Sequence, residues 1–357
     1  MKNKIVTILF CIFVFGFMII NIIVKNEELS YSERRRLATL PEITIENIFN
    51  GKITNSLESY LTDHFVFRNT FRSIKTVFNL NVFNKKDTNN LYYENEHIFK
   101  IEYPLKEEKV DNFINKVNTI YQTHLTNNKV YLSIIPDKNY YSNNNYLSLD
   151  YNKLINNVTT NINENIKYID ITKSLKLDDY YKTDLHWKQE KLSKVVNTLS
   201  KEMNFSTMNN YNENSYDEFY GGYYGQLGLN VDPDKLIYLT NDTINNSTIN
   251  DIDSKTTTVY EKESLGKMDS YDVYLSGATP LVEITSNKTQ SQKELIIFRD
   301  SFTSSLAPLM LDGYKKITLV DLRYMNSSLL TNYVNFDNKE VLFLYNTSII
   351  NNSDMLK

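Results

Sequence analysis

Residues 293–311 read KELIIFRDSFTSSLAPLML. The segment begins with an apolar run, Leu295–Phe298, turns polar for several residues and then becomes apolar again. A short apolar run that is bounded by turn residues is typical of a buried strand. We therefore predict a strand, a sharp turn and a helix, with Ser301 located where the strand ends and the helix begins.

Similar apolar runs recur along the chain and predict further strands. They alternate with segments of helical pattern, which indicates a largely parallel sheet covered by helices on both faces, and hence an α/β fold class. Sites in such sheets lie at the carboxyl ends of strands, so the loops after Ile135, Phe298 and Val320 are candidates. The predicted strands lie within residues 129–138, 166–175, 315–325 and 339–348, and the predicted helices within residues 106–125 and 187–203.

The N-terminus predicts a transmembrane helix. Lys2 and Lys4 precede an apolar segment from Ile5 to Val24, and its length of about 20 residues matches the hydrocarbon core of a bilayer. Flanking lysines favour the cytoplasmic side, and the segment lacks the small-residue cleavage site of a secretory signal peptide. We therefore predict an uncleaved signal anchor in a single-pass protein of the cell membrane, with an extracytoplasmic catalytic domain.

Changes in composition along the chain divide it into three regions. We predict a signal anchor at residues 1–25, a juxtamembrane and helical segment at residues 26–80, and a catalytic domain at residues 81–357. Polar runs within residues 206–292 predict a loop-rich insertion in that domain. A helical pattern covers residues 44–79, because apolar residues recur there at three- and four-residue spacings: Ile48, Leu57, Tyr60, Leu61, Phe65, Phe71, Ile74 and Phe78.

The overall composition excludes several classes of protein. A formal net charge of −4 over 357 residues provides no basic surface for binding nucleic acid. Cys11 is the only cysteine and lies in the predicted anchor. A disulfide within the chain and a cysteine-based metal site are therefore both impossible.

Residues 183–187 read TDLHW and supply an acid and a histidine. In an extended segment, residues i and i+2 point the same way, so Asp184 and His186 can share a face. Together with Ser301 they form a candidate nucleophile, base and orienting acid, and Trp187 is expected to pack behind the imidazole. The Ser301 N–H, at a helix N-terminus, is a predicted oxyanion donor. A helix cap is the alternative role for Ser301.

Other residues are candidates for substrate binding. Lys138 follows a predicted strand together with Asp137, and the two either line the site or belong to a solvated loop. Tyr223 and Tyr224 lie in the sequence GGYYGQ. They provide either a stacking surface for sugar rings or packing for a glycine-rich turn.

The remaining histidines have structural interpretations. Asp63, His64 and Arg68 lie in YLTDHFVFR, which predicts either an ordered turn with an ion pair or a functional cluster. His97 is expected to be structural or exposed. His124 is expected at the C-terminal end of a helix, where a cation is favourable. His64 is the first alternative to His186 as a base.

Several of these segments resemble those of a known family. TDLHW is similar to the Asp-His-His-Trp signature of the DHHW protein family, with Leu185 in the second position. FRDSF, residues 298–302, resembles the serine block of SGNH hydrolases, and of the alginate O-acetylation proteins in particular. Residues 59–75 resemble an Asp-His-Phe-x-x-Arg segment near the family's N-terminus. The resemblance extends from about residue 30 to the C-terminus, and IIPDK, FYGGYYGQLGL and YDVYLSGATPL also contribute to it.

The resemblance implies an SGNH-hydrolase-like fold and O-acetylation of an exported polysaccharide outside the membrane. It implies Ser301 as nucleophile, His186 as base and Asp184 as the partner of His186. It also implies a membrane-bound O-acyltransferase partner that supplies acetyl, and no metal or organic cofactor. One departure is Arg299, which stands where the family has glycine in Gly-Asp-Ser, and we add it to the candidate substrate-binding residues. Asp300 is expected to shape the turn.

Three functions therefore remain open from the sequence. The first is an anchored O-acetyltransferase acting on a polysaccharide. The second is a carbohydrate acetyl esterase that uses the same triad, because sugar and water differ only as acceptors of the acyl group. The third is a noncatalytic protein that binds or assembles polysaccharide.

Overall fold

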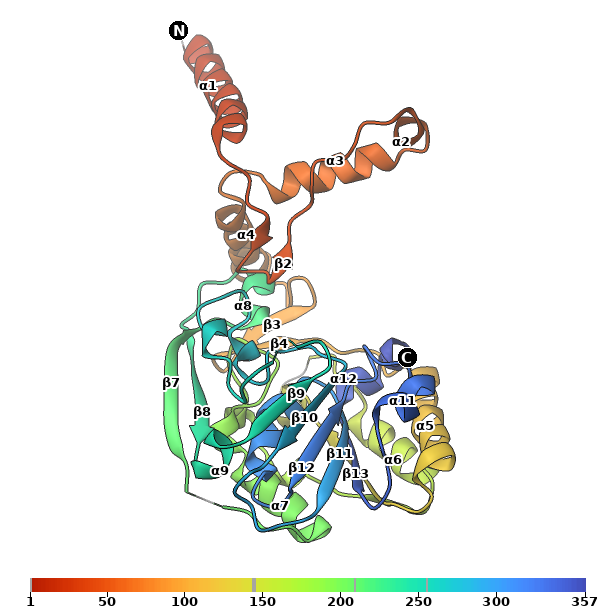
Figure 1. Ribbon diagram of the computed structural model, residues 1–357. Helices are drawn as coiled ribbons and strands as arrows, with labels where there is room; N and C mark the ends of the chain where they lie inside the picture. Colours follow the sequence, from red (N-terminus) through yellow and green to blue (C-terminus); the bar gives the residue numbers. More distant parts are fainter. Residues whose placement is uncertain (1, 143–145, 209, 255) are drawn as a thin grey trace. The chain divides into compact units, whose positions relative to one another are not determined.

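The computed structural model of the protein describes all residues except 1, 143–145, 209 and 255. The described chain folds as two compact units (Figure 1). The smaller unit consists of Met1–Asn89 and Tyr224–Val231, and the larger unit consists of Asn90–Tyr223 and Asp232–Lys357. Both candidate triad segments, TDLHW and FRDSF, belong to the larger unit.

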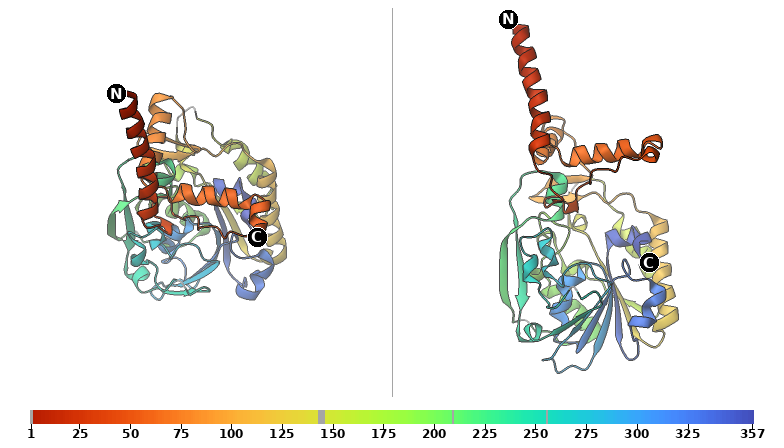
Figure 2. Two further views of the ribbon diagram at one scale, coloured as in Figure 1. Left: turned by 90° about the horizontal axis from the view of Figure 1, so that it is seen from above. Right: turned by 45° about the horizontal axis from the view of Figure 1, so that its top comes forward.

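A sheet forms the centre of the larger unit, and seven strands belong to it within the described residues (Figure 1, Figure 2). Its first five strands are parallel, whereas β10 is antiparallel to both β12 and β9. The predicted α/β fold with a mostly parallel sheet is therefore confirmed. In spatial order the strands are β6 (Ile166–Tyr168), β5 (Lys129–Ile135), β13 (Glu340–Asn346), β11 (Glu294–Arg299), β12 (Lys316–Val320), β10 (Leu281–Thr285) and β9 (Thr248–Asp251).

Helices cover both faces of this sheet. Along β11, Leu295 and Ile297 belong to one buried cluster, and Ile296 and Phe298 belong to the other. This alternation follows from the two-residue period of a strand. The first cluster includes apolar residues of α7 (Ser193–Met203), and the second includes those of α5 (Glu107–Ile120) and α6 (Tyr151–Asn161). A strand that is buried on both faces reads as a continuous apolar run, as residues 295–298 do.

Smaller elements complete the larger unit. Two antiparallel pairs lie outside the central sheet, β3 with β4 and β7 with β8. The region predicted as a loop-rich insertion contains β7, β8 and α9, and it also contributes β9 and β10 to the central sheet. The bounds are β3 (Leu91–Glu94), β4 (His97–Lys100), β7 (Asn212–Phe219), β8 (Asp234–Thr240), α9 (Asp242–Asn245), α10 (Thr303–Leu306), α11 (Leu330–Tyr333) and α12 (Thr347–Ile350).

The smaller unit contains the N-terminal helix and the helical segment that follows it. Among the described residues, one helix is long and apolar enough to cross a membrane, Asn3–Ile23, with a mean hydropathy of 2.8. The helical pattern at residues 44–79 corresponds to three α-helices, α2, α3 and α4. The elements are α1 (Lys2–Ile23), β1 (Leu29–Ser30), β2 (Arg35–Arg36), α2 (Ile45–Phe49), α3 (Lys52–Asp63), α4 (Arg68–Val77), and α8 (Gly222–Leu227), which begins in the larger unit.

Ion pairs join the segments of the smaller unit. Glu33 pairs with Arg68 at 2.5 Å and with Arg72 at 3.1 Å. Asp63 pairs with Arg35 at 2.5 Å, and hydrogen bonding to Arg35 lowers the pKa of Asp63 to about 2. The sequence YLTDHFVFR therefore forms a turn between α3 and α4 that is held by ion pairs.

Candidate active site

The segment Tyr180–Trp187 forms a closed loop in the larger unit. A β-bridge joins Tyr180 to Trp187, and inside it the Tyr181 N–H donates to the His186 carbonyl at 3.0 Å. The bridge and this hydrogen bond close the loop that contains Asp184 and His186.

Asp184, His186 and Ser301 form one hydrogen-bonded chain. His186 Nδ1 lies 2.6 Å from Asp184 Oδ1, and His186 Nε2 lies 2.8 Å from Ser301 Oγ. Asp184 is fully buried and His186 is 5% exposed, whereas Ser301 is partly exposed. Asp184 Oδ1 also accepts the His186 backbone N–H at 3.1 Å. The two side chains meet because the backbone bends between them, and the predicted extended geometry is wrong.

Two glycines support the buried acid. The Gly222 N–H donates to Asp184 Oδ2 at 2.8 Å, so both carboxylate oxygens have partners. At Gly221 a Cβ would lie 2.3 Å from Asp184 Cβ and 2.3 Å from the Thr183 carbonyl oxygen, so this position requires glycine. The sequence GGYYGQ therefore contributes backbone support to Asp184, a role that sequence reasoning missed.

Two buried charged side chains hold the backbone of the same loop. Lys138 Nζ donates to the carbonyl oxygens of Tyr181, Lys182 and Asp184 at 3.0, 3.1 and 2.8 Å. Asp234 accepts the N–H groups of Lys182 and Thr183, each at 2.8 Å. Burial lowers the pKa of Lys138 to about 7, although the negative charge of Asp234 opposes the shift. Both side chains hold the loop that carries Asp184 and His186.

Ser301 lies directly after the carboxyl end of β11. Asp300 shapes this turn, because its Oδ1 accepts the Phe302 N–H at 3.0 Å and its Oδ2 accepts the Asn346 N–H at 2.6 Å. The helix that follows, α10, has four residues and begins at Thr303. Within the described residues, no hydrogen bond occupies the Ser301 N–H, which leaves it available for an oxyanion.

Aromatic rings enclose the imidazole. Tyr271 stacks on His186 with centroids 3.8 Å apart and an interplanar angle of 7°, and Phe302 approaches His186 at 4.8 Å. Trp187, which was expected behind the imidazole, lies in the core instead and donates from Nε1 to the Phe302 carbonyl at 3.0 Å and to Ser305 Oγ at 2.9 Å. It therefore anchors the turn that carries Ser301. Tyr271 is a residue of this site that sequence reasoning missed, because its stacking on His186 exists only in the folded chain.

The four candidate substrate-binding residues have different surroundings. Lys138 is 2% exposed and Arg299 is fully buried, where it donates to Ser304 Oγ at 2.7 Å and burial lowers its pKa. Because both side chains are buried, they are placed to position neighbouring residues. Tyr223 is partly exposed and its ring lies 5.2 Å from Lys138 Nζ, within the unit that holds the triad. Tyr224 belongs to the smaller unit.

The other histidines lie apart from this chain of hydrogen bonds. His97 is 4% exposed, and burial lowers its pKa. His124 stacks on Phe336 with centroids 5.5 Å apart. His64 lies in the smaller unit, where its Nε2 is 2.8 Å from the Ala38 carbonyl oxygen. Among the described residues, no group of three or more His, Cys, Asp or Glu side chains is placed to hold a metal ion.

Comparison with solved structures shows the same fold in bacterial proteins. A DHHW family protein from Eubacterium siraeum has a TM-score of 0.61 and 17% identity, over 76% of this chain and 97% of its own. Bacillus cereus PatB1 has a TM-score of 0.58 and 18% identity, over 73% of this chain and 96% of its own. PatB1 with a sulfonyl adduct has a TM-score of 0.56 and 17% identity, over 73% and 97%. No family model matches the sequence, and a comparison with curated proteins found no match.

Proposed function

We propose that the protein is an O-acetyltransferase that modifies an exported or cell-surface polysaccharide, with Ser301, His186 and Asp184 as its catalytic triad. The observation that carries this proposal is the continuous hydrogen-bonded chain from the Asp184 carboxylate through His186 to the Ser301 hydroxyl. A serine hydroxyl is a poor nucleophile unless an adjacent base activates it. The likeness in fold to a DHHW family protein agrees with the motif resemblance and supports the same assignment.

The first half-reaction acetylates Ser301. His186 Nε2 takes the hydroxyl proton while Ser301 Oγ attacks the carbonyl carbon of the acetyl donor. Asp184 holds the Nδ1–H and stabilises the imidazolium that forms. The Ser301 N–H donates to the oxyanion of the tetrahedral intermediate. When the intermediate collapses, His186 gives the proton to the leaving group, and acetyl-serine remains.

The second half-reaction transfers acetyl to a sugar hydroxyl. His186 takes the proton of that hydroxyl, the sugar oxygen attacks the acetyl carbon, and Ser301 leaves with the proton returned by His186. Water in place of the sugar yields acetate. The choice between transferase and esterase therefore depends on acceptor binding and not on the triad.

The membrane setting belongs to the same proposal. The length and hydropathy of α1 support a membrane anchor. Lys2 and Lys4 then favour a cytoplasmic N-terminus, which puts the catalytic unit outside the cell. Acetyl groups from inside the cell must cross the bilayer to reach it. We therefore include a membrane-bound O-acyltransferase as the partner that supplies acetyl.

The proposal is tested by acetyl transfer with the full-length protein in detergent. A chromogenic acetyl ester is the donor and oligosaccharides are the acceptors, with acetylated sugar measured by mass spectrometry and ester cleavage by absorbance. We expect transfer by the wild type and none by Ser301→Ala. We also expect a sulfonyl fluoride to label Ser301 in the wild type and to fail in His186→Ala, because the labelling needs an activated serine.

Each other outcome selects a different function. Efficient ester cleavage without acetylated sugar replaces the transferase with an acetyl esterase. Full transfer by folded Ser301→Ala removes the triad assignment. If a folded wild type shows neither ester cleavage nor labelling, the result favours a noncatalytic protein that binds polysaccharide.

A further inference from the structure

The amphipathic helix α4 presents its apolar face outward. Phe67, Phe71, Ile74 and Phe78 recur at spacings of three and four residues and therefore share one side of a helix. Their exposed fractions are 60%, 42%, 46% and 49%. A surface helix of a soluble protein turns such a stripe toward the core. In α4 the stripe remains largely exposed.

The polar side of α4, and not its apolar side, packs against residues 225–228 of the smaller unit. Arg72 donates to the Gly225 carbonyl at 2.9 Å, Ser73 to the Gly228 carbonyl at 2.5 Å, and Thr76 to the Leu227 carbonyl at 2.6 Å. Thr76 is only 2% exposed. The orientation of α4 is thus set by hydrogen bonds at several positions, and the outward apolar stripe is a consequence of how the unit is built.

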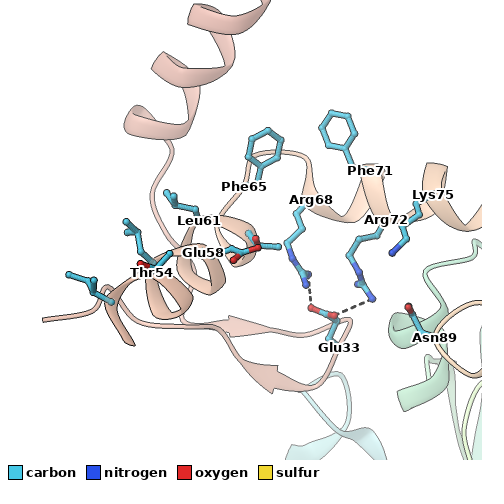
Figure 3. A pocket seen from close by; sticks show the side chains of 13 residues that line it. Glu33, Thr54, Glu58, Leu61, Phe65, Arg68, Phe71, Arg72, Lys75 and Asn89 are labelled. Carbon is cyan, nitrogen blue, oxygen red and sulfur yellow. Dashed lines mark hydrogen bonds and ion pairs between the residues drawn. The ribbon is translucent and has the colours of Figure 1, made fainter. Parts of the chain in front are cut away.

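An open groove continues this apolar surface between α3 and α4. Its volume is about 950 Å³, and Leu57, Leu61, Phe65 and Phe71 contribute its apolar wall. Figure 3 shows Phe65 and Phe71 pointing away from Glu33, whereas Arg68 and Arg72 point toward it. The charged side chains therefore neutralise one another on the inner side, and the outer side is left apolar.

The same surface is continuous with α1. The ring of Phe17 lies 5.9 Å from that of Phe65 and 6.1 Å from that of Phe71. Asn21 Oδ1 accepts the Val66 N–H at 2.8 Å, which ties the polar side chain near the end of α1 to the turn before α4. Phe17 precedes the end of α1 at Ile23 by roughly 9 Å, at 1.5 Å per residue. Phe65 and Phe71 contact Phe17 and therefore lie at its level along the axis of α1.

We propose that the apolar faces of α3 and α4 are embedded in the membrane interface, with lipid acyl chains in the groove between them. This inference rests on the proposed membrane anchoring by α1, because α1 brings Phe65 and Phe71 into the bilayer. Amphipathic helices of this kind lie in the interface with their apolar side among the acyl chains. Lys75 lies beside the apolar stripe and, together with Lys85 and Lys86, lines a shallow pocket. These lysines are placed to contact lipid phosphates.

A bilayer fits this surface better than a second protein does. The apolar surface begins on a helix whose length and hydropathy match a membrane, and Phe65 and Phe71 contact Phe17 of that helix directly. Exposed apolar patches of this extent are rare on soluble monomers. The protein therefore contacts the membrane with α1, α3 and α4.

The experiment measures the depth of single labels in full-length protein reconstituted into nanodiscs. Cys11→Ser removes the only native thiol, and single cysteines carrying an environment-sensitive fluorophore are placed at Phe71, Ile74, Asn69 and Val14. Lipids with nitroxide groups at shallow or deep positions act as quenchers. Asn69 is exposed on the side of α4 opposite the apolar stripe and serves as the matched control.

We expect the labels at positions 71 and 74 to be quenched by shallow nitroxides and the label at position 69 to remain in water. The label at position 14 reports on α1 alone. If position 14 is quenched and positions 71 and 74 are not, the interfacial proposal is wrong while the anchor stands. If position 14 is not quenched, the anchor itself is wrong. Shielding of positions 71 and 74 that appears only at high protein-to-lipid ratio would assign the surface to a second copy and overturn the lipid assignment.

Discussion

His186 Nε2 lies 2.8 Å from Ser301 Oγ, although 115 residues separate the two in the sequence. The contact joins two loops that are built independently, the closed loop at Tyr180–Trp187 and the turn after β11. Trp187 connects them, because its indole N–H donates to the Phe302 carbonyl next to Ser301. A buried hydrogen bond beside the site thus helps to set the distance between His186 Nε2 and Ser301 Oγ.

Asp184→Asn is expected to lower kcat for acetyl transfer by roughly 10⁴-fold while the protein stays folded, as for the orienting acid of serine proteases. An amide oxygen still accepts the Gly222 N–H, which the carboxylate accepts at 2.8 Å. An amide facing His186 Nδ1 favours the wrong tautomer of the imidazole. The measurement is steady-state kinetics with a chromogenic acetyl ester, with circular dichroism as the folding control. Activity close to wild type in the folded variant would exclude Asp184 as the orienting acid.

Tyr271→Ala is expected to lower kcat by about tenfold with little change in KM for a small ester, since the ring orients the imidazole and does not contact the donor. Tyr271→Phe is the matched control, because it keeps the ring that stacks on His186 and removes only the hydrogen bond to Ser305 Oγ. Equal losses of kcat in the two variants would assign the effect to the hydroxyl group and not to stacking.

Four of the five strands that sequence reasoning identified are buried on both faces, whereas the fifth, β6, has one buried residue among its three. In β5, β11, β12 and β13 every or nearly every residue is buried, and such strands appear as apolar runs. The antiparallel strands β9 (TIND) and β10 (LVEIT) were missed within the predicted insertion. Half or more of the residues in β9 are at least partly exposed, so its local sequence carries little strand signal.

At residues 44–79, the periodicity of the sequence predicts the faces of a helix but not what each face contacts. The spacing of Phe71, Ile74 and Phe78 predicts that they share a face. In the structure they lie in α4 and at the start of the π-helical turn that follows it, Phe78–Val82, and all three are exposed. Periodicity does not state what that face contacts. Only the hydrogen bonds from Ser73 and Thr76 to residues 227 and 228 reveal that the polar side is the inner one.

The site was predictable to the extent that residue type limits the chemistry. Ser301, His186 and Asp184 were singled out because few side chains serve as nucleophile, base and orienting acid, and the structure brings the three into one hydrogen-bonded chain. Gly222 and Tyr271 act through contacts with residues far away in the sequence, and those contacts exist only after folding. The likeness of TDLHW to a family signature pointed to the loop, but not to the groups that hold it.

Gly221→Ala is expected to lower both stability, by about 1–3 kcal/mol, and activity, by more than tenfold. The added methyl group would lie 2.3 Å from Asp184 Cβ and must displace the acid. Gly313→Ala is the matched control, because its methyl group would lie 2.5 Å from Phe205 Cδ2 in the core and would strain the fold without contacting the triad. Thermal unfolding and ester kinetics at a temperature where both variants are folded separate the two effects. Equal kcat in both variants would contradict a role for Gly221 in placing Asp184.

The stability of the protein is expected to depend on pH through Lys138. Burial lowers the pKa of Lys138 to about 7 in the folded protein, from an ordinary value of 10.5. Below pH 7 the amine is charged in both states, and the folded state bears the cost of a buried charge. Between pH 7 and 10.5 the unfolded chain binds more protons than the folded protein does. Linkage then requires the free energy of unfolding to rise with pH through this window, by at most about 1.4 kcal/mol per pH unit.

Lys138→Met removes this titration and also the donors to the carbonyls of Tyr181, Lys182 and Asp184. We therefore expect the stability advantage of the wild type over Lys138→Met to grow by about 2 kcal/mol between pH 7 and pH 9. Lys173→Met, at an exposed lysine, should show a constant difference over the same range. Chemical unfolding in detergent at a series of pH values measures all three proteins. A constant difference for Lys138→Met as well would mean that the buried amine does not titrate near pH 7, and that it holds the loop in a single charge state.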